Sequence, residues 1–504
     1  MTEDGKHKTL EQLRQTRLSK IDELREKGIN PYPYEFDVTK HVNDLISEFD
    51  KLTESKEIVS VAGRLMSNRR MGKVAFSHLQ DQTGRMQIHI RKDGIGEDGY
   101  DLFKLLDIGD FIGVKGYLFT TKTGEKTIWV NELTLLSKSI RPLPVIKSKE
   151  EEGETKVFQE FTDKEQRYRQ RYADLAVHPD VREIFFKRTK IVSTMRKFLD
   201  DNSCLEVDTP VLQPMYGGAM AEPFVTHHNA LDRKLYLRIA DELYLKRLLV
   251  GGFERVYEFS KDFRNEGMDR SHNPEFTMLE LYVAYWDYND MLKFVEEMIS
   301  HIALELNGTT EVTYRGVKID LKAPWKVQSY YDALKEYGGV DLYGASKDEI
   351  IKAIEKNDVD VDRKLPEGKL LDKYFGAVVE PHLDGPIFIK DYPLLLSPLA
   401  KKHRDDPNLV ERFEPFLFGM EIGNAFTELN DPIDQRERFE MQSVARAEGD
   451  VEAQQLDEDY IRAMEYGMPP NAGLGVGIER LVMILTDSPS IKDVILFPLL
   501  KSED

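Results

Sequence analysis

Alternation of apolar and polar residues predicts a strand–loop–strand unit in the second half of the chain. Residues 256–266 and 274–282 are rich in aromatic and aliphatic side chains, and a polar loop that ends at Pro274 separates them. Because side chains alternate along a strand, the second strand divides into a core face with Thr277, Leu279 and Leu281, and an opposite face with Phe276, Met278, Glu280 and Tyr282. An aromatic ring, a carboxylate and a phenol away from the core indicate that this strand lines a site. The simpler alternative is an amphipathic strand pair with a solvated outer face.

A glycine-rich segment near residue 475 favours the site over that alternative. Gly473, Gly475 and Gly477 recur at every second position, so they leave one face of a strand bare and a ligand can lie against the backbone. Arg480 then falls in the first turn of an apolar helix, where an anion is a natural partner. The chain has neither a Walker A motif nor a GxGxxG fingerprint in a βαβ unit.

The first third of the chain shows a different pattern. A capping box at Thr9 opens an amphipathic helix that ends at Gly28. Short alternating segments follow and predict five strands, at 58–64, 74–79, 86–90, 111–119 and 128–136. Five strands in so short a stretch suggest a closed barrel of the OB type, a fold that binds oligonucleotides. In the third strand, Gln87 and His89 are expected on the outer face.

Composition sets the broad class. The chain has 504 residues, of which 41% are apolar, so it is long enough for more than one domain. Its net charge is −20, yet residues 61–150 carry 15 Lys and Arg against 10 Asp and Glu. Attraction of a polyanion depends on the local field, so the acidic total does not exclude RNA.

Cysteine usage and hydropathy narrow the class further. The single cysteine, Cys204, excludes an intrachain disulfide and a cysteine zinc cluster, and we expect a buried thiol. The sequence has no secretory signal and no apolar run long enough to span a membrane, so a cytoplasmic protein is expected.

Three segments in order carry a family resemblance. An amphipathic helix and strand at about 182–210, the unit at about 256–282 and the glycine-rich segment at about 471–486 resemble motifs 1, 2 and 3 of the class II aminoacyl-tRNA synthetases. Within that class the chain most resembles the bacterial-type lysyl-tRNA synthetases, from about Thr9 to Leu500. The resemblance implies an α+β fold, with an N-terminal five-stranded OB-type barrel and a catalytic domain built on an antiparallel sheet flanked by helices.

The resemblance also implies an organisation for the whole chain. A helical extension would occupy 1–57, an anticodon-binding barrel 58–145, a linker leading to the catalytic domain 146–180, and the catalytic domain 181–504. The lysine- and glutamate-rich part of the linker is expected to be solvated. An insertion at about 290–390 carries no readable chemistry.

A synthetase of this type would join lysine to ATP and then transfer it to tRNA(Lys). The implied catalytic residues are Arg264 and Arg480. The implied ATP-binding residues are Arg264, Glu266, His272, Phe276, Glu421 and Arg480, with adenine between Phe276 and Arg480. Glu414 and Glu421 would bind magnesium, of which the family holds several ions with ATP, and no zinc is implied. Seven positions separate these two acids, so a bend, hairpin or bulge is needed to bring them together.

Acidic residues single out the amino acid. The implied lysine-binding residues are Gly218, Glu242, Arg264, Glu280, Tyr282, Asn424 and Glu428. Glu280, Tyr282 and Glu428 would hold the side-chain ammonium. The implied anticodon-binding residues are Arg69, Phe76, Gln87 and Glu132, with Phe76 stacking on a base, although a lone Phe76 would more often be a core residue.

Two positions depart from the family pattern. Ala425 stands where bacterial members usually have Gly and could narrow the lysine pocket by a methyl group. Glu479 stands where Asp is common.

The apolar surface of motif 1 implies a homodimer. The alternatives are an aspartyl- or asparaginyl-tRNA synthetase, a lysine ligase that modifies a protein, and a non-catalytic RNA-binding paralogue. An acidic pocket would repel aspartate.

Overall fold

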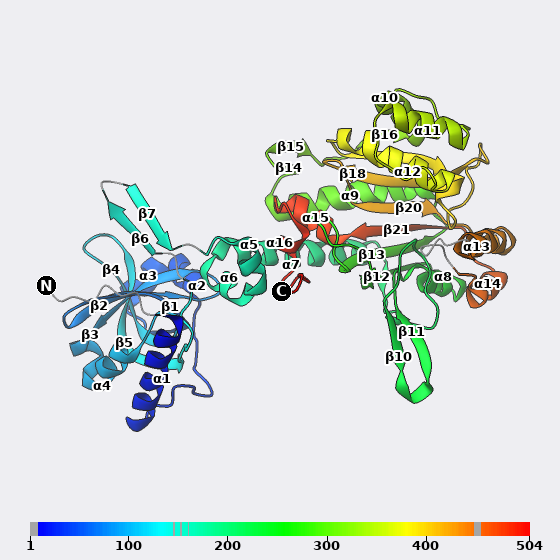
Figure 1. Ribbon diagram of the computed structural model, residues 1–504. Coiled ribbons are helices and arrows are strands. Elements are labelled where there is room, and N and C mark those ends of the chain that lie inside the picture. Colours follow the sequence, from blue (N-terminus) through cyan, green and yellow to red (C-terminus); the bar gives the residue numbers. More distant parts are fainter. Residues whose placement is uncertain (1–8, 145–146, 152–153, 160, 448–454, 504) are drawn as a thin grey trace. The chain divides into compact units, whose positions relative to one another are not determined.

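The chain folds into two compact units, Met1–His178 and Pro179–Asp504. The computed structural model describes residues 9–144, 147–151, 154–159, 161–447 and 455–503 (Figure 1).

A closed five-stranded barrel forms the centre of the first unit, as predicted. Its strands are β1 (Val59–Met71), β2 (Val74–Gln80), β3 (Arg85–Arg91), β4 (Phe111–Thr120) and β5 (Lys126–Ser137), in the order β1-β2-β3-β5-β4. Helix α4 (Lys92–Leu105) connects β3 to β4. Alternation fills the interior with residues such as Ile88 and Ile90, both 0% exposed. The opposite face of β3 carries Gln87 and His89. In OB folds, the corresponding face of the barrel binds nucleic acids.

Helices and a hairpin complete this unit. The helices are α1 (Leu10–Glu26), α2 (Val42–Ser47), α3 (Phe49–Ser55), α5 (Lys164–Arg169) and α6 (Arg171–Val177). Helix α1 begins at the predicted capping box, where Thr9 accepts from the Gln12 amide. Within the linker, β6 (Lys147–Glu151) and β7 (Glu154–Gln159) form an antiparallel hairpin that was not predicted.

A nine-stranded sheet forms the second unit. Its order is β16-β17-β18-β20-β21-β13-β12-β8, and β19 pairs with β18. The strands are β8 (Leu205–Glu206), β12 (Arg255–Phe263), β13 (Glu275–Ala284), β16 (Lys326–Ser329), β17 (Ile387–Pro393), β18 (Leu409–Leu417), β19 (Met420–Glu421), β20 (Gly423–Thr427) and β21 (Asn471–Gly477). The centre is antiparallel, whereas the pairs β16–β17 and β12–β8 at the two ends are parallel.

The two faces of the sheet pack against different elements. Leu279, Leu281 and Val283 of β13 pack into a core with α7 (Pro179–Asp201), α9 (Tyr288–Asn307) and α15 (Ile478–Leu485). Tyr282, on the other face of β13, packs with α8 (Glu242–Val250). The predicted alternation of β13 is therefore confirmed, and the face away from the main core is free to form a cavity.

Smaller elements surround the sheet. Strands β9 (Leu212–Gln213), β10 (Val225–His228) and β11 (Arg233–Leu237) form a separate sheet, and β14 (Glu311–Tyr314) pairs with β15 (Val317–Asp320). The remaining helices are α10 (Tyr330–Gly338), α11 (Lys347–Lys356), α12 (Glu367–Val378), α13 (Pro432–Ala447), α14 (Glu458–Glu465) and α16 (Ile491–Val494). Helices α10 to α12 pack over β17 around their own core. Across the described residues, every helix is too short or too polar to cross a membrane.

Candidate active site

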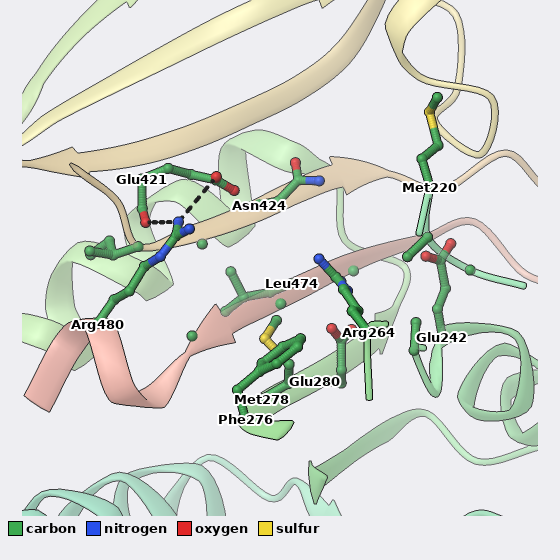
Figure 2. Close-up of a pocket in the computed structure, with 18 of the residues that line it drawn as sticks. Met220, Glu242, Arg264, Phe276, Met278, Glu280, Glu421, Asn424, Leu474 and Arg480 are labelled. Atoms are coloured by element: carbon green, nitrogen blue, oxygen red, sulfur yellow. Dashed lines mark hydrogen bonds and ion pairs between the residues drawn. The ribbon is translucent and has the colours of Figure 1, made fainter. Parts of the chain in front are cut away.

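A cavity of about 340 Å³ opens on the sheet face that carries Tyr282. Its lining comes from β13, β20, β21, the start of α8 and the loop between β12 and β13. Figure 2 shows Glu421 and Arg480 at one end, Glu242 and Met220 at the other, and Arg264 between them. The strand–loop–strand unit and the glycine-rich strand, distant in sequence, thus meet at one site.

The end with Arg480 combines cations with a flat ring. The Arg264 guanidinium lies 5.0 Å from the centre of the Phe276 ring. Arg480 Nη1 donates to the Glu421 carbonyl oxygen at 2.7 Å and lies 3.4 Å from Glu421 Oε2. A ring faced by the Arg264 guanidinium, with Arg480 also lining the cavity, suits an aromatic ligand that carries anionic groups.

His272 connects this end to the loop between β12 and β13. Its Nε2 lies 3.1 Å from Arg480 Nη2, and its Nδ1 lies 2.8 Å from Asp269 Oδ2. Arginine has no acceptor, so Nε2 must accept and the Nδ1 proton is donated to Asp269. In this tautomer the imidazole links Asp269 of the loop to the Arg480 guanidinium. Glu266, on the same loop, is exposed and also lines the cavity.

A tight hairpin brings Glu414 and Glu421 together, as their spacing required. Strands β18 and β19 turn through Phe418 and Gly419, both with positive φ, and Phe416 lies opposite Glu421. Glu414 accepts from the Tyr392 hydroxyl at 2.6 Å and from Arg412 at 2.5 Å. Burial raises the pKa of Glu414 to about 7, against the opposing effect of Arg412, and the negative charge of Glu421 adds to the rise. The two carboxylates thus repel each other.

The end with Glu242 is acidic and buried. Glu280 is 8% exposed, and the Tyr282 hydroxyl donates to its Oε2 at 3.0 Å. Burial raises the pKa of Glu280 well above its usual value, and the nearby Asp241, Asp262 and Glu242 raise it further. Glu428 is 0% exposed and lines the same end. Its Oε2 forms an ion pair with Lys246, and its Oε1 has no hydrogen-bond partner among the described residues.

Glycines make room for these acids. On β21, Gly473, Gly475 and Gly477 lie opposite Tyr282, Glu280 and Met278 of β13. A methyl group on Gly473 would lie 2.0 Å from Glu428 Oε1, and one on Gly475 would lie 2.6 Å from Glu280 Oε1. The bare face expected to receive a ligand is therefore filled, at these two positions, by the cavity's own carboxylates. Only Gly477 of the three leaves the space open.

Gly218 and Asn424 complete the wall. Gly218 has φ +88°, and a methyl group there would lie 3.2 Å from Glu242 Cβ, so both its backbone conformation and its close approach favour glycine. Arg412 Nε donates to Asn424 Oδ1 at 3.0 Å, and this contact fixes the amide beside the cavity.

The suggestion that Ala425 narrows the pocket is wrong. Asn424 and Phe426 of β20 line the cavity, so alternation turns Ala425 to the opposite face, where it lies in the main core at 0% exposure.

Glu479 of the motif 3 segment contacts residues of the motif 1 and motif 2 segments. It accepts from the Thr277 amide and hydroxyl, both at 2.8 Å, and pairs with Arg188 of α7 at 2.6 Å.

Comparison with known proteins identifies the family. Residues 163–501 match the family described as tRNA synthetases class II (D, K and N). The chain belongs to the class II tRNA synthetases. Residues 59–136 match the OB-fold nucleic acid binding domain.

Full-length relatives agree with the family match. The chain is 51% identical over 501 residues to the lysine–tRNA ligase of Carboxydothermus hydrogenoformans, an alignment that covers 99% of this chain and 100% of the relative. It is 53% identical to the lysine–tRNA ligase of Christiangramia forsetii, covering 98% and 87%, and 52% identical to that of Porphyromonas gingivalis, covering 97% and 85%.

Sequence reasoning missed the charged residues behind the cavity of this synthetase. Lys246 of α8 donates to Glu242 Oε1 at 2.6 Å. Arg238 pairs with Glu258 at 2.6 Å and lies 3.4 Å from Asp262. Asp241, the N-cap residue of α8, is 0% exposed, and neither of its carboxylate oxygens has a hydrogen-bond partner in the described part of the chain. The Glu242–Lys246 spacing of four residues on a helix was the one available signal.

The synthetase barrel gathers aromatic rings on one face. The Phe76 and His89 rings stack with their centres 4.6 Å apart, and Trp129 meets His89 edge-on at 4.9 Å. Phe76 is half-buried, and Arg69 lies opposite it in the strand register. Gln87 donates to Glu125 at 2.7 Å and accepts from Thr127 at 2.8 Å, whereas Glu132 pairs with Lys115 at 3.0 Å. Phe76, Gln87 and Glu132 therefore already have partners in the free protein.

Proposed function

We propose that the protein is a cytoplasmic enzyme that activates lysine with ATP and transfers it to tRNA(Lys). One observation carries the choice of amino acid: three buried carboxylates, Glu242, Glu280 and Glu428, line one end of a cavity whose other end holds arginines. Buried acids need cationic partners, and lysine brings two ammonium groups. The names of the full-length relatives support the same substrate.

The carboxylates divide the two ammonium groups between them. Glu242 and the backbone at Gly218 receive the α-amino group, while Glu280, Tyr282 and Glu428 receive the side-chain ammonium. Asn424 contacts the lysine backbone between them. Aspartate would place its side-chain carboxylate beside Glu280 and Glu428, so the pocket disfavours the substrate of a sister enzyme.

Activation joins the lysine carboxylate to the α-phosphorus of ATP and expels pyrophosphate. The nucleophile is already anionic, so no base is needed, and the chain must align two anions and offset their charge. Arg264 lies between the two ends of the cavity and bridges the lysine carboxylate and the α-phosphate. Adenine stacks between Phe276 and Arg480, while Glu266 and His272 contact the adenine and ribose. Arg480 also holds the γ-phosphate, which requires it to exchange its contact with His272 for one with ATP.

Glu414 and Glu421 have the chemistry of a magnesium site. They are hard oxygen donors, and their mutual repulsion would be relieved by a cation. Among the described residues no three acidic, histidine or cysteine side chains form a metal cage, which suits an ion that completes its shell with water and phosphate. When bound, magnesium would neutralise charge on the phosphates.

The barrel recognises the tRNA. The ring face around Phe76 offers a stacking platform, and Arg69, Gln87 and Glu132 supply polar contacts to the anticodon. In the free protein the bond from Gln87 to Glu125 orients the Gln87 amide.

Amino-acid-dependent ATP–pyrophosphate exchange, measured separately with all the standard amino acids, tests this function. Lysine should support magnesium-dependent exchange, and lysylation of tRNA(Lys) should follow. Exchange with aspartate or asparagine but not lysine would replace the substrate assignment. Absence of exchange with every amino acid would favour a non-catalytic protein.

A further inference from the structure

Lys246 places an ammonium group of the protein at the acidic end of the cavity, beside the two that a bound lysine would bring. It lies on α8, one turn after Glu242, and is 0% exposed. Its Nζ donates to Glu242 Oε1 at 2.6 Å and forms an ion pair with Glu428 Oε2. The ring of Phe426 lies 5.8 Å from Nζ. Lys246 itself does not line the cavity, so it contacts two lining acids from behind.

The two acids depend on this contact for their charge. Burial raises the pKa of both Glu242 and Glu428, and the Lys246 ammonium opposes that rise. Burial also disfavours the charged form of Lys246, but Glu242 and Glu428 together raise its pKa well above the usual value. Each carboxylate thus favours the charged form of Lys246, and Lys246 favours the charged form of each carboxylate. Removing the cation would leave two buried carboxylates without a counter-charge.

Lys246 offsets negative charge at the acidic end of the cavity. Of the three carboxylates there, Glu242, Glu280 and Glu428, it contacts two, Glu242 and Glu428. Without Lys246, protons would compete with the substrate's ammonium groups for these two carboxylates.

We propose that Lys246 is a positioning residue for lysine recognition: its ammonium group holds the Glu242 and Glu428 carboxylates side by side and ionised, ready for the substrate's two ammonium groups. The inference rests on the proposed function. Lys246 fixes Glu428 Oε2 and leaves Oε1 directed at the space over Gly473, where no described residue donates to it. The cation thus determines which carboxylate oxygen remains for the ligand.

Titratable groups from several packed elements lie around the Lys246 ammonium. Glu242 lies on the same helix, Glu428 follows β20, and Tyr460 comes from α14. Glu280 and Tyr282 of β13 lie beyond the two carboxylates. Among these groups Lys246 is the sole cation, so its loss should alter the protonation of Glu242 and Glu428 first.

The test is Lys246→Met, which keeps the length and apolar stem of the side chain and removes its charge. The lysine KM in ATP–pyrophosphate exchange should rise at least about tenfold, because Glu242 and Glu428 become protonated or displaced, while the ATP KM stays within about twofold of wild type. The acidic limb of kcat/KM for lysine should move to higher pH by about one unit, since both acids then ionise less readily. Lys352→Met, an exposed position on α11, is the matched control and should change none of these quantities.

A double variant keeps the inference falsifiable if Lys246→Met folds poorly. Lys246→Met combined with Glu428→Gln removes one cation and one anion, so the buried charge balance of wild type is preserved. If Lys246 acts through the carboxylates, the double variant is no weaker toward lysine than the weaker single variant. Multiplying defects, or a Lys246→Met enzyme with wild-type lysine KM and pH profile, would overturn the inference. Wild-type enzyme is measured in the same assay. If it shows no lysine-dependent exchange, the proposed function is wrong. If it activates lysine and the Lys246 variants behave as just described, only the role of Lys246 is wrong.

Discussion

Glu428 is the single side chain at which the acidic pocket can be tested most directly. Glu428→Gln keeps the size of the side chain and removes a charge that is fully buried. A hydrogen bond to a charged group contributes about 1.5–3 kcal/mol, so the lysine KM should rise by about tenfold or more. The ATP KM should change little, because the proposed phosphate contacts lie at the other end of the cavity. Glu440→Gln, exposed on α13, is the control. A rise in the ATP KM with lysine unaffected would instead assign Glu428 to the phosphate end.

The buried Asp262 side chain should make the free energy of unfolding depend on pH. Its side chain is buried and its Oδ2 has no hydrogen-bond partner among the described residues. Burial raises its pKa to about 6, although Arg264 and Arg238 oppose the rise. Between about pH 4 and 6 the folded protein keeps a proton that the unfolded chain releases, so this contribution to stability is lost as the pH rises through that window.

Asp262→Asn should therefore increase the free energy of unfolding at pH 8 by about 1–3 kcal/mol. Urea unfolding at pH 8 and at pH 4 measures the effect, and the gain should shrink at the lower pH. The exposed Asp360→Asn should leave both values unchanged. A gain of the same size at both pH values would mean that the substitution acts through packing.

Side-chain alternation explains which residues could be predicted. The alternation of β13 placed Phe276, Met278, Glu280 and Tyr282 on one face, and all four line the cavity. The same rule, applied to β20, would have turned Ala425 into the core rather than the pocket. The partners of Glu428 could not be predicted, because Lys246 reaches it from a helix that precedes it by about 180 residues, and one sequence holds no signal for that contact.

At the scale of elements, the opposition of β21 and β13 yields a prediction about the glycines. A methyl group on Gly473 would overlap Glu428 Oε1 and lie 2.5 Å from the Tyr282 ring, so Gly473→Ala should displace the pocket acids. Lysine-dependent exchange should fall at least about tenfold, mainly through the lysine KM. Gly477→Ala is the matched control, because its nearest neighbour would be 3.9 Å away, and its lysine KM should stay close to wild type. Equal effects from both substitutions would show that backbone flexibility, not space, requires glycine.

The ring face of the barrel predicts a separate effect on tRNA. Phe76→Ala should weaken tRNA binding by about 1–3 kcal/mol, the usual contribution of base stacking, and leave lysine activation unchanged. The tRNA KM in aminoacylation and the rate of pyrophosphate exchange measure the two effects. Phe111→Ala removes a ring of β4 that is 40% exposed and lies outside the Phe76–His89 stack, and it should alter neither. Parallel losses in both assays would mean that Phe76 only supports the barrel core.

Turns decided how well elements could be predicted. Five barrel strands and the β12–β13 pair followed from alternation and turn residues. A bend, hairpin or bulge between Glu414 and Glu421 was predicted, and the structure has the hairpin. Its turn at Phe418, with φ +53°, could not be predicted, because a bulky residue rarely adopts that conformation. The β6–β7 hairpin was missed because its strands are rich in Lys and Glu, which favour solvated segments.

At the scale of the whole molecule, the motif 1 region has an open strand edge and exposed apolar side chains. Strand β8 is the last strand of the nine-stranded sheet, so its outer edge has no partner strand in the order given by the described residues. Leu205 on β8 is 48% exposed, Phe186 on α7 is 51% exposed, and Leu212 is 49% exposed. An open edge with exposed apolar side chains is a liability that proteins normally cover. A second copy of the chain would cover it, as the homodimer implied by the resemblance requires.

The protein should therefore sediment as a dimer at micromolar concentration. Phe186→Asp combined with Leu205→Asp should produce a monomer, because two buried charges at one interface cost several kcal/mol. Exchange activity should fall with dissociation, since α7 also holds Glu479 through Arg188, and Glu479 fixes the Thr277 backbone beside Phe276. Leu304→Asp, at an equally exposed leucine of α9, controls for the added charge and should remain dimeric and active. An active wild-type monomer at that concentration would contradict the assignment of this surface to dimerisation.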